Sequence, residues 1–258
     1  MIVPVLKGGL GNQLFQISTA ICKAEKEDTG IAINYNFRHL VTQGNHPNNY
    51  KDNLYKKIPT TQTAPDYIVR EQGFAYTPLP NGKDMTLDGY FQSEKYFPNY
   101  REKLNKVFCF PDNIKEKINK SFAKLNKKIL GIHIRLGDFY KVHTNVHFVC
   151  TKNYYTNALK KFNLDEYVVI VTTDEPENFQ RYLPTDNYIL CNSKNEIEDL
   201  YLLSQCDDLI ISNSTFSWWG AYLGKAKKRV CVPEKWFASD GPKDYQDIYN
   251  ESWEKVEI

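Results

Sequence analysis

Polar side chains of types that bind phosphate follow three apolar runs in the second half of the chain. Arg135 comes directly after the first run. Asp174 is the last residue of the polar group Thr172-Thr173-Asp174, which follows the second run. The third run, 209–211, leads into the sequence SNST at 212–215, directly before a predicted helix. A guanidinium binds two phosphate oxygens at once, and the first N–H groups of a helix favour an anion. If the runs are neighbouring parallel strands, these residues converge at one sheet edge and form a phosphate site.

Each of these residues also has an ordinary structural role. Arg135 can form a structural ion pair, and His133, in the same predicted strand, can be a hydrogen-bonded core residue. Asp199 can be the charge that a helix start favours, and SNST can cap the helix that follows it. In the first half, GGLGNQ at 8–13 lacks the third glycine of the dinucleotide fingerprint, so it can be a tight strand-to-helix turn.

The acidic and histidine residues give little support for a metal site. No Asp-x-Asp pair occurs, although such carboxylates commonly hold Mg²⁺ or Mn²⁺ on a diphosphate. His143 and His147 are four residues apart with Cys150 nearby, but a full set of zinc ligands is not visible. We therefore expect no metal and no cofactor. Arginine, hydroxyls and helix dipoles would then neutralise a diphosphate leaving group.

Alternating apolar runs and helical patterns are predicted to position these residues. The chain opens as strand, glycine loop, helix and strand over 2–34, and the pattern then weakens as far as about 105. From 113 onward strands and helices alternate, which is typical of a doubly wound parallel sheet. The predicted strands are 67–70, 85–91, 129–135, 167–172, 187–191, 208–212 and 229–232, and the predicted helices are 113–127, 154–162, 175–182, 196–206 and 216–223.

Length and composition describe an ordinary globular protein. The 258 residues are 41% hydrophobic and 25% charged, with a net charge of +2 that gives no reason to expect nucleic acid as a partner. Six cysteines without a CxxC pair indicate reduced, mostly buried thiols. The N-terminus does not look like a signal peptide, and no apolar run approaches the roughly 18 residues of a membrane-spanning helix. We expect a cytoplasmic protein, with peripheral association with a membrane left open.

Several segments, in order along almost the whole chain, resemble glycosyltransferase family 11, the α-1,2-fucosyltransferases. They are GGLGNQLFQ (8–16), GYFQSEKYF (89–97), HIRLGDF (133–139), YYTNALK (154–160), DLYLLSQCDDLIISNSTFSWWGAYL (199–223) and VPEKWF (232–237). The most specific piece is SNSTFSWWGAYL in combination with HIRLGD. More remotely, HIRLGD and 199–217 resemble the α-1,6- and protein O-fucosyltransferases, which share the GDP-fucose site.

The resemblance implies an α/β, GT-B-like fold of two Rossmann-like lobes with parallel sheets. An acceptor-side lobe over 1–115 would precede a GDP-sugar-binding lobe over 116–258. His133 and Asp199 would read the guanine edge, and Arg135 would bind the diphosphate and stabilise the leaving group. The remaining donor-binding residues would be Asn213, Ser214, Thr215, Phe216 and Ser217 at a helix start, and Gly9, Gly11, Asn12 and Gln13 in the N-terminal loop.

The chain departs from the family pattern at two places, and the resemblance leaves two candidates for the general base. The family often has a second arginine where Leu136 stands, so one cationic contact would be missing. Thr172-Thr173-Asp174 replaces the usual Ser-Asp-Asp. The base candidates are Asp138, which can equally hold Arg135 in place, and His147, which precedes Tyr154-Tyr155 as a histidine does in bacterial relatives. A path with weak base assistance stays open.

The sequence thus predicts an inverting, metal-independent transfer of L-fucose from GDP-β-L-fucose to the 2-hydroxyl of a galactoside. One alternative is a transferase that uses another GDP-sugar or forms another linkage. The other is a catalytically inactive protein that binds glycans or nucleotides.

Overall fold

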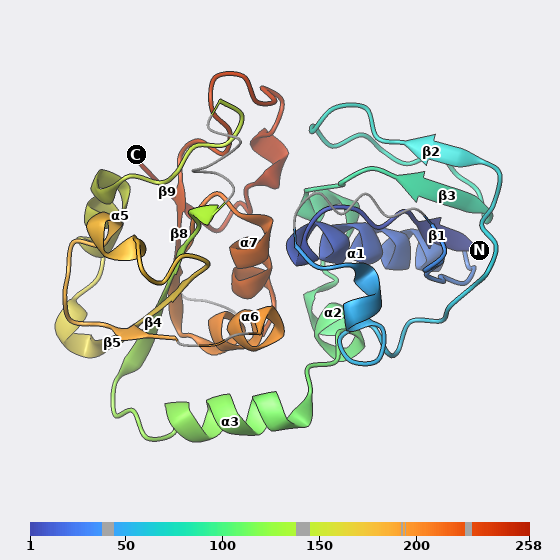
Figure 1. The fold of residues 1–258 in the computed structure, drawn as a ribbon. Coiled ribbons are helices and arrows are strands. Elements are labelled where there is room, and N and C mark those ends of the chain that lie inside the picture. Colours follow the sequence, from blue (N-terminus) through green and yellow to red (C-terminus); the bar gives the residue numbers. More distant parts are fainter. Residues whose placement is uncertain (38–43, 138–144, 192, 194, 225–228) are drawn as a thin grey trace. The chain divides into compact units, whose positions relative to one another are not determined.

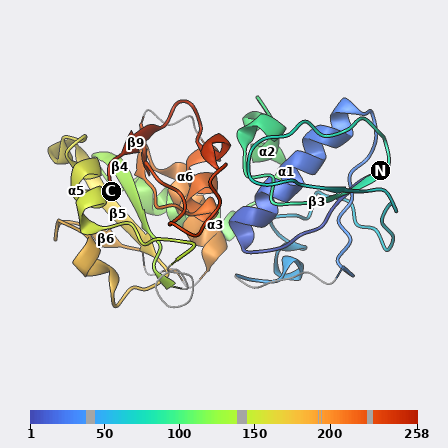
Figure 2. The same cartoon turned by 90° about the horizontal axis from the view of Figure 1, so that it is seen from above.

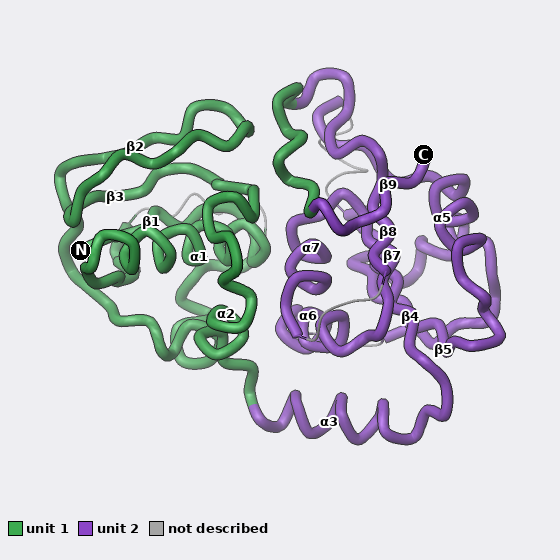
Figure 3. The backbone as a smooth tube through the Cα atoms, turned by 180° about the vertical axis from the view of Figure 1, so that it is seen from behind, with its two compact units in different colours: residues 1–111, 242–250 green, residues 112–241, 251–258 purple. Residues whose placement is uncertain are grey.

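The computed structural model describes residues 1–258 apart from 38–43, 138–144, 192, 194 and 225–228 (Figure 1). The chain forms two compact units (Figure 3). Unit 1 comprises Met1–Pro111 and Pro242–Asn250, and unit 2 comprises Asp112–Gly241 and Glu251–Ile258. The chain therefore crosses from one unit to the other after residues 111, 241 and 250.

Unit 1 contains a three-stranded parallel sheet in the order β1-β3-β2. The strands are β1 (Ile2–Pro4), β2 (Ile68–Arg70) and β3 (Met85–Asp88). Pro4 lies opposite Leu87, and Arg70 lies opposite Asp88, so the carboxyl ends of all three strands reach one edge. The second strand predicted within 2–34 appears only as isolated bridges at residues 31 and 33.

Helix α1 (Leu10–Lys26) follows β1 after the glycine loop and packs along the sheet (Figure 2). Nearly all its residues up to Ala24 are buried, including the polar Gln13 and Gln16, whose amides bond nearby backbone. Buried amides are tolerated because they are paired in this way. The shorter helices of the unit are η1 (Pro47–Tyr50), η2 (Glu94–Tyr96), α2 (Arg101–Val107) and η5 (Gln246–Ile248).

Unit 2 contains a six-stranded parallel sheet in the order β6-β5-β4-β7-β8-β9. The strands are β4 (Lys128–Ile134), β5 (Tyr167–Thr173), β6 (Ile189–Leu190), β7 (Asp208–Ile210), β8 (Val230–Pro233) and β9 (Glu254–Val256). The helices are α3 (Asp112–Phe122), α5 (Lys152–Leu159), η3 (Leu164–Glu166), η4 (Phe179–Tyr182), α6 (Glu196–Gln205) and α7 (Thr215–Tyr222).

Strand β4 lies inside this sheet and presents different residues to its two faces. Alternate residues of a strand point to opposite sides. Ile132 and Ile134 join a core cluster with Tyr154 and Tyr155 of α5. His133, on the other face, has its ring 5.4 Å from that of Phe216 in α7. Helices therefore cover both faces of the sheet, and the expected α/β fold with parallel sheets is confirmed.

The helix predicted at 175–182 is wrong, because the structure has only the short 3-10 helix η4 there. Pro184 disfavours helical geometry at the residue before it, and Pro176 removes a backbone donor. Fewer than two regular turns fit between the two prolines. Strand β9, close to the C-terminus, was not predicted because three residues show no readable alternation.

Residues 242–250 belong to unit 1 although the preceding and following residues belong to unit 2. Asp244 Oδ2 accepts hydrogen bonds from the backbone N–H groups of Phe74 (2.9 Å) and Ala75 (3.2 Å). Asp247 Oδ2 accepts another from Tyr76 N (2.8 Å). These carboxylates hold the loop that follows β2. Among the described residues, no helix combines the length and apolar character that crossing a membrane requires.

Candidate functional site

The site of unit 2 lies where β4, β5 and β7 end at the carboxyl edge of the sheet. The register of β4 and β5 places His133 opposite Thr172 and Ile134 opposite Thr173. β7 lies on the other side of β4 and continues into Ser212 and Asn213. The polar groups that follow three separate runs in the sequence are therefore brought to the same edge.

Arg135 is held by the residue that ends the β5 run. Its Nη1 lies 2.9 Å from Asp174 Oδ2, and the backbone N of Leu136 donates to Asp174 Oδ1 at 2.9 Å. A Cβ on Gly137 would collide with the same carboxylate, so this close approach requires glycine. About a quarter of each charged side chain remains exposed, 28% for Arg135 and 25% for Asp174. The guanidinium is thus fixed in direction and partly exposed.

His133 is almost completely buried beside Arg135. Its Nδ1 lies 2.9 Å from Ser212 Oγ, so this ring nitrogen is already used. Burial, with a smaller contribution from the Arg135 charge, lowers the pKa of His133 to about 3. The imidazole is therefore neutral at neutral pH, and Nε2 is the nitrogen left for a ligand.

The residues of the SNST segment divide into two groups. Asn213 donates to the carbonyls of Phe148 and Trp236, both at 3.0 Å, and Ser217 Oγ donates to Ser214 O at 3.2 Å. These two side chains hold the start of α7 in place. Ser214 is the N-cap of α7 without a side-chain capping bond, and Thr215 and Phe216 are partly exposed. The open N-terminus of α7 is suited to an anion.

Asp199 lies in the first turn of α6, and the Cys191 thiol donates to its Oδ1 at 3.3 Å. Burial is the main cause that raises the pKa of Asp199 to about 6. No contact among the described residues joins Asp199 to Arg135 or His133. Its carboxylate is therefore a separate polar group of unit 2, with a titration close to neutral pH.

Thr172 was named from the sequence only as part of the group Thr172-Thr173-Asp174 and was given no role of its own. It is 1% exposed, lies opposite His133, and its Oγ1 has no hydrogen-bond partner among the described residues. A buried hydroxyl without a partner is uncommon. The signal available in the sequence was its position, directly before Thr173 and Asp174 at a strand end.

Leu136 does not stand in the place of a phosphate contact. Its side chain is 2% exposed and belongs to the core cluster that contains Ile134 and Tyr155. The interpretation that a cationic contact is lost through this residue is therefore wrong for this structure. The side chain after Arg135 points into the core, where an unpaired charge would be costly.

The two base candidates differ in what the structure shows. Asp138 lies outside the described residues, as does His143. The ring of His147 lies 5.3 Å from that of Phe237.

Cys150, a possible metal ligand, is buried, which raises the pKa of its thiol to about 12 and keeps it neutral. Among the residues that the structure describes, no three His, Cys, Asp or Glu side chains gather as a metal site would require.

The N-terminal loop of unit 1 is fixed by its own side chains. Gln13 Nε2 donates to the carbonyls of Gly8 and Asn45, both at 3.0 Å, and its Oε1 accepts from the Tyr55 hydroxyl. Asn12 Oδ1 accepts from Gln92 Nε2 at 2.9 Å. Of the other predicted residues, Gly9 is the N-cap of α1 and Gly11 is buried in its first turn. Gln13 therefore has a structural role whatever else the loop binds.

Comparison with known proteins gives consistent matches along the chain. The model of a family described as "Glycosyl transferase family 11" matches residues 5–257. An Escherichia coli alpha-1,2-colitosyltransferase is 25% identical, with 100% of this chain and 99% of the relative covered. A Caenorhabditis elegans galactoside 2-alpha-L-fucosyltransferase is 24% identical, with 99% of this chain and 79% of the relative covered.

Solved structures also resemble the chain. Fucosyltransferase NodZ from Bradyrhizobium superposes with a TM-score of 0.56 at 13% identity, covering 94% of this chain and 96% of its own. A structure of NodZ alpha-1,6-fucosyltransferase soaked with GDP-fucose gives a TM-score of 0.52 at 11% identity, covering 90% and 94%. At these identities the likeness concerns the fold.

Proposed function

This chain belongs to glycosyl transferase family 11, and from that premise we propose that it transfers L-fucose from GDP-β-L-fucose to the 2-hydroxyl of a galactoside, with inversion and without a metal. The observation that carries the proposal is the Arg135–Asp174 pair beside His133 and the start of α7. The names of the relatives support fucosyl-type transfer, because they include galactoside 2-alpha-L-fucosyltransferases.

The proposed chemistry requires positive charge near the departing GDP. Glycosyl transfer passes through an oxocarbenium-like transition state, and negative charge grows on the diphosphate as the sugar leaves. We assign this stabilisation to the partly exposed guanidinium of Arg135 and to the first N–H groups of α7 at Ser214, Thr215 and Phe216. Because both are fixed before the reaction, they stabilise the transition state more than the ground state.

Arg135 and α7 also make a metal unnecessary in this proposal, since together they supply the positive charge that Mg²⁺ would bring. Activity in excess EDTA tests this point directly. A complete loss of turnover that is restored by Mg²⁺ or Mn²⁺, with GDP binding intact, would contradict it.

Guanine recognition is assigned to His133 and Asp199. A carboxylate can accept both N–H groups on the Watson–Crick edge of guanine, and adenine offers no such pair. The neutral imidazole of His133 can use Nε2 toward the base because Nδ1 is bonded to Ser212. Gly9, Gly11, Asn12 and Gln13 keep the assignment given by the resemblance, as the loop that faces the transferred sugar.

Acceptor activation is the step with two candidates. The attacking hydroxyl must lose its proton at some stage of an inverting displacement, and a positioned general base can take it. We propose Asp138 and His147 as the candidates for this base. The pH profiles of the Asp138→Asn and His147→Gln variants distinguish between them.

A colitosyl donor is the second candidate function, because a relative over the full length of the chain carries that name. Colitose is L-fucose without the 3-hydroxyl. A site that hydrogen-bonds this hydroxyl discriminates strongly against the deoxy sugar, by about 10⁴–10⁵, whereas a site that merely leaves room for it does not. Measuring kcat/KM for GDP-fucose and for GDP-colitose under the same conditions therefore decides between the two donors.

Thermal unfolding with GDP, UDP and ADP, each in EDTA, is the first experiment. A ligand at a hundred times its dissociation constant adds about 2.7 kcal/mol to the free energy of unfolding. For a chain of this size the melting temperature should rise by about 5–10 °C. A rise with GDP alone supports the proposed donor site. Equal behaviour with all three nucleotides contradicts it.

A further inference from the structure

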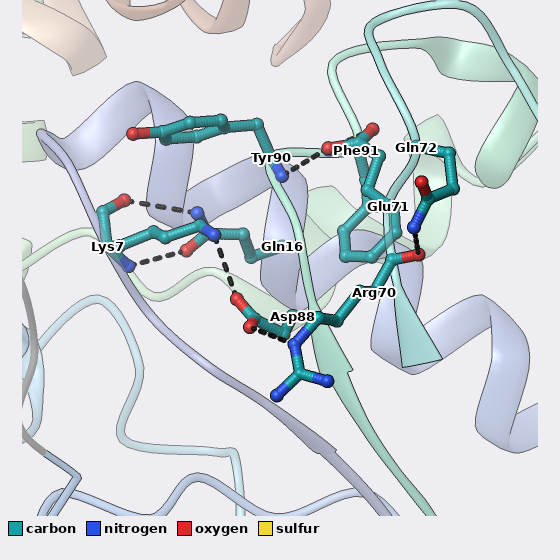
Figure 4. A network of polar contacts seen from close by, with 8 residues as sticks. All are labelled: Lys7, Gln16, Arg70, Glu71, Gln72, Asp88, Tyr90 and Phe91. Atoms are coloured by element: carbon teal, nitrogen blue, oxygen red, sulfur yellow. Dashed lines mark hydrogen bonds and ion pairs between the residues drawn. The ribbon is translucent and has the colours of Figure 1, made fainter. Parts of the chain in front are cut away.

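A cluster of charged and aromatic side chains lies at the carboxyl edge of the unit 1 sheet, and the donor site does not use it (Figure 4). We call it the edge cluster and define it by Lys7, Phe74, Asp88 and Tyr90. Lys7 follows β1, Phe74 follows β2, and Asp88 and Tyr90 lie at the end of β3. In parallel sheets this edge is where ligands bind. Tyr90 also belongs to the GYFQSEKYF motif, to which no role has been given so far.

Glu71 determines where Tyr90 stands. Its Oε2 accepts from Tyr90 N at 2.6 Å, and its Oε1 accepts from Phe91 N at 2.9 Å. Phe91 has a φ of +52°, an unfavourable value for a bulky residue, and its side chain is fully buried. Gly89 allows the approach, since a Cβ there would collide with Glu71. Glu71 is thus a positioning residue that holds a strained turn.

The ring of Tyr90 is flanked by a cation and by a second aromatic ring. Lys7 Nζ lies 5.1 Å from its centroid, and the Phe74 ring lies 6.2 Å away with an interplanar angle of 21°. Tyr90 is partly exposed, and its hydroxyl makes no hydrogen bond to a described residue. Figure 4 shows the ring extending from the strand end over the Lys7 side chain. The ring of Tyr90 is therefore partly exposed between two neighbours, and its hydroxyl is available to bond a ligand.

Lys7 and Asp88 provide the polar groups of the cluster. Lys7 Nζ lies 2.8 Å from Asp88 Oδ1. The Lys7 backbone is held by Gln16, which accepts from its N at 3.0 Å and donates to its O at 3.1 Å. Asp88 also lies 3.6 Å from Arg70 Nε, and about 29% of its side chain is exposed. A carboxylate has about four acceptor positions, so Asp88 keeps capacity for hydroxyl donors.

We propose that the edge cluster binds one pyranose ring of the acceptor, a β-galactoside, with the C–H face of the sugar against Tyr90. This inference rests on the proposed function. The axial 4-hydroxyl of galactose leaves one face with contiguous C–H groups, which suits an aromatic ring. The hydroxyls at the rim of the sugar bond to Asp88 and Lys7, whose charges strengthen those bonds. An aromatic wall with a few fixed polar groups is the usual composition of a small-ligand site.

The test measures initial rates with lactose as the varied acceptor and saturating GDP-fucose. Tyr90→Ala is expected to raise the KM for lactose about tenfold or more, because about 1.4 kcal/mol of binding corresponds to tenfold. Tyr90→Phe keeps the ring and is expected to raise it less. Tyr67→Ala is the matched control, since Tyr67 is a 55% exposed tyrosine of the same unit outside the cluster. The KM for GDP-fucose should stay within twofold in all three.

A KM for lactose within twofold of wild type in both Tyr90→Ala and Phe74→Ala overturns the proposal. If Tyr90→Ala does not fold, Tyr90→Phe and Phe74→Ala decide. If the wild-type protein transfers nothing, saturation-transfer NMR of lactose tests the cluster independently of the proposed function. Lactose signals that disappear in Phe74→Ala and persist in Tyr67→Ala then support the site, and absence of signals with the wild type contradicts it.

Discussion

Asp174 bonds two consecutive residues, because one of its oxygens pairs with the Arg135 guanidinium and the other accepts the backbone N–H of Leu136. The side chain and the backbone beyond β4 are therefore fixed by one carboxylate from the neighbouring strand. In this arrangement a structural ion pair and a phosphate ligand are not alternatives. The pair directs the guanidinium, and 28% of the Arg135 side chain stays exposed, as the proposed contact with the donor requires.

Arg135→Ala is expected to lower kcat by about 10²–10³-fold, as loss of a group that stabilises developing charge typically does. Arg135→Lys should rescue little, because an ammonium lacks the planar fork that pairs with both Asp174 and phosphate. Steady-state rates with GDP-fucose and lactose give the comparison. An unchanged kcat in a folded Arg135→Ala protein would contradict the assigned role.

Asp174→Asn is expected to lower kcat by a smaller factor of about 10–100-fold, since misplacement of a catalytic group by about 1 Å has effects of that size. The amide still accepts one hydrogen bond but no longer neutralises the guanidinium. A double variant with Arg135→Ala should be no slower than Arg135→Ala alone. Additive losses in the double variant would show that Asp174 acts independently of Arg135.

Leu136→Arg is expected to destabilise unit 2 by about 3 kcal/mol or more, because the charge would enter a packed core. Leu136→Met conserves volume and should lose less than about 1.5 kcal/mol. Urea unfolding monitored by tryptophan fluorescence measures both. A folded Leu136→Arg protein that binds GDP more tightly would instead show that the position can reach the phosphates.

Affinity for GDP is expected to fall as the pH drops through about 6, since the pKa of Asp199 is raised to about 6 and guanine requires the carboxylate. Titration calorimetry between pH 5 and 8 measures this dependence. Asp199→Asn should lose it, together with the preference for GDP over ADP. A wild-type affinity that is flat over this range would contradict the guanine assignment.

The same raised pKa also predicts the effect of Asp199 on folding. The folded state binds the proton more tightly than the unfolded chain, so Asp199 lowers stability above about pH 6 and less so as the pH falls toward 4. Asp199→Asn should accordingly be more stable than wild type at pH 7–8, by roughly 1–3 kcal/mol. The difference should shrink as the pH falls from about 6 to 4 and vanish below about 4. Unfolding midpoints at several pH values provide the measurement.

His133 is expected to affect the acid limb of stability in the opposite sense. Burial lowers its pKa to about 3, so the folded state excludes a proton that the unfolded chain takes up below about pH 6.5. Its contribution to stability is lost progressively as the pH falls from about 6.5 toward 3. His133→Gln should flatten this part of the curve, and an unaltered slope would show that other groups determine it.

The sequence was sufficient to predict that the polar residues after three strands meet at one sheet edge, because this follows from strand order alone. Once the runs ending near Arg135, Asp174 and Ser212 are taken as parallel neighbours, their ends must meet. The same reasoning could not show that Leu136 points into the core. Strand β4 ends at Ile134, so the alternation of a strand no longer determines where the side chain of Leu136 points. The backbone at Leu136 is held instead by the hydrogen bond from its N–H to Asp174.

The edge cluster could not be predicted from the sequence for a different reason. Glu71 and Tyr90 are 19 residues apart, and the predicted strands 67–70 and 85–91 do not by themselves show that these two residues meet. Phe74 is held by Asp244, which lies 170 residues further along the chain. Contacts of this kind depend on the tertiary fold, and no local periodicity in the sequence predicts them.

The return of residues 242–250 has a consequence for synthesis on the ribosome. Domains tend to fold as units during translation, starting from the N-terminus. Unit 1 departs from that order, because the carboxylates that bond the N–H groups of Phe74, Ala75 and Tyr76 belong to Asp244 and Asp247, which are synthesised about 170 residues later. Until those two residues emerge, that loop remains incomplete. A nascent chain stalled shortly before residue 242 should therefore be cut by protease near 72–77 and resist cutting there once Asp247 has emerged.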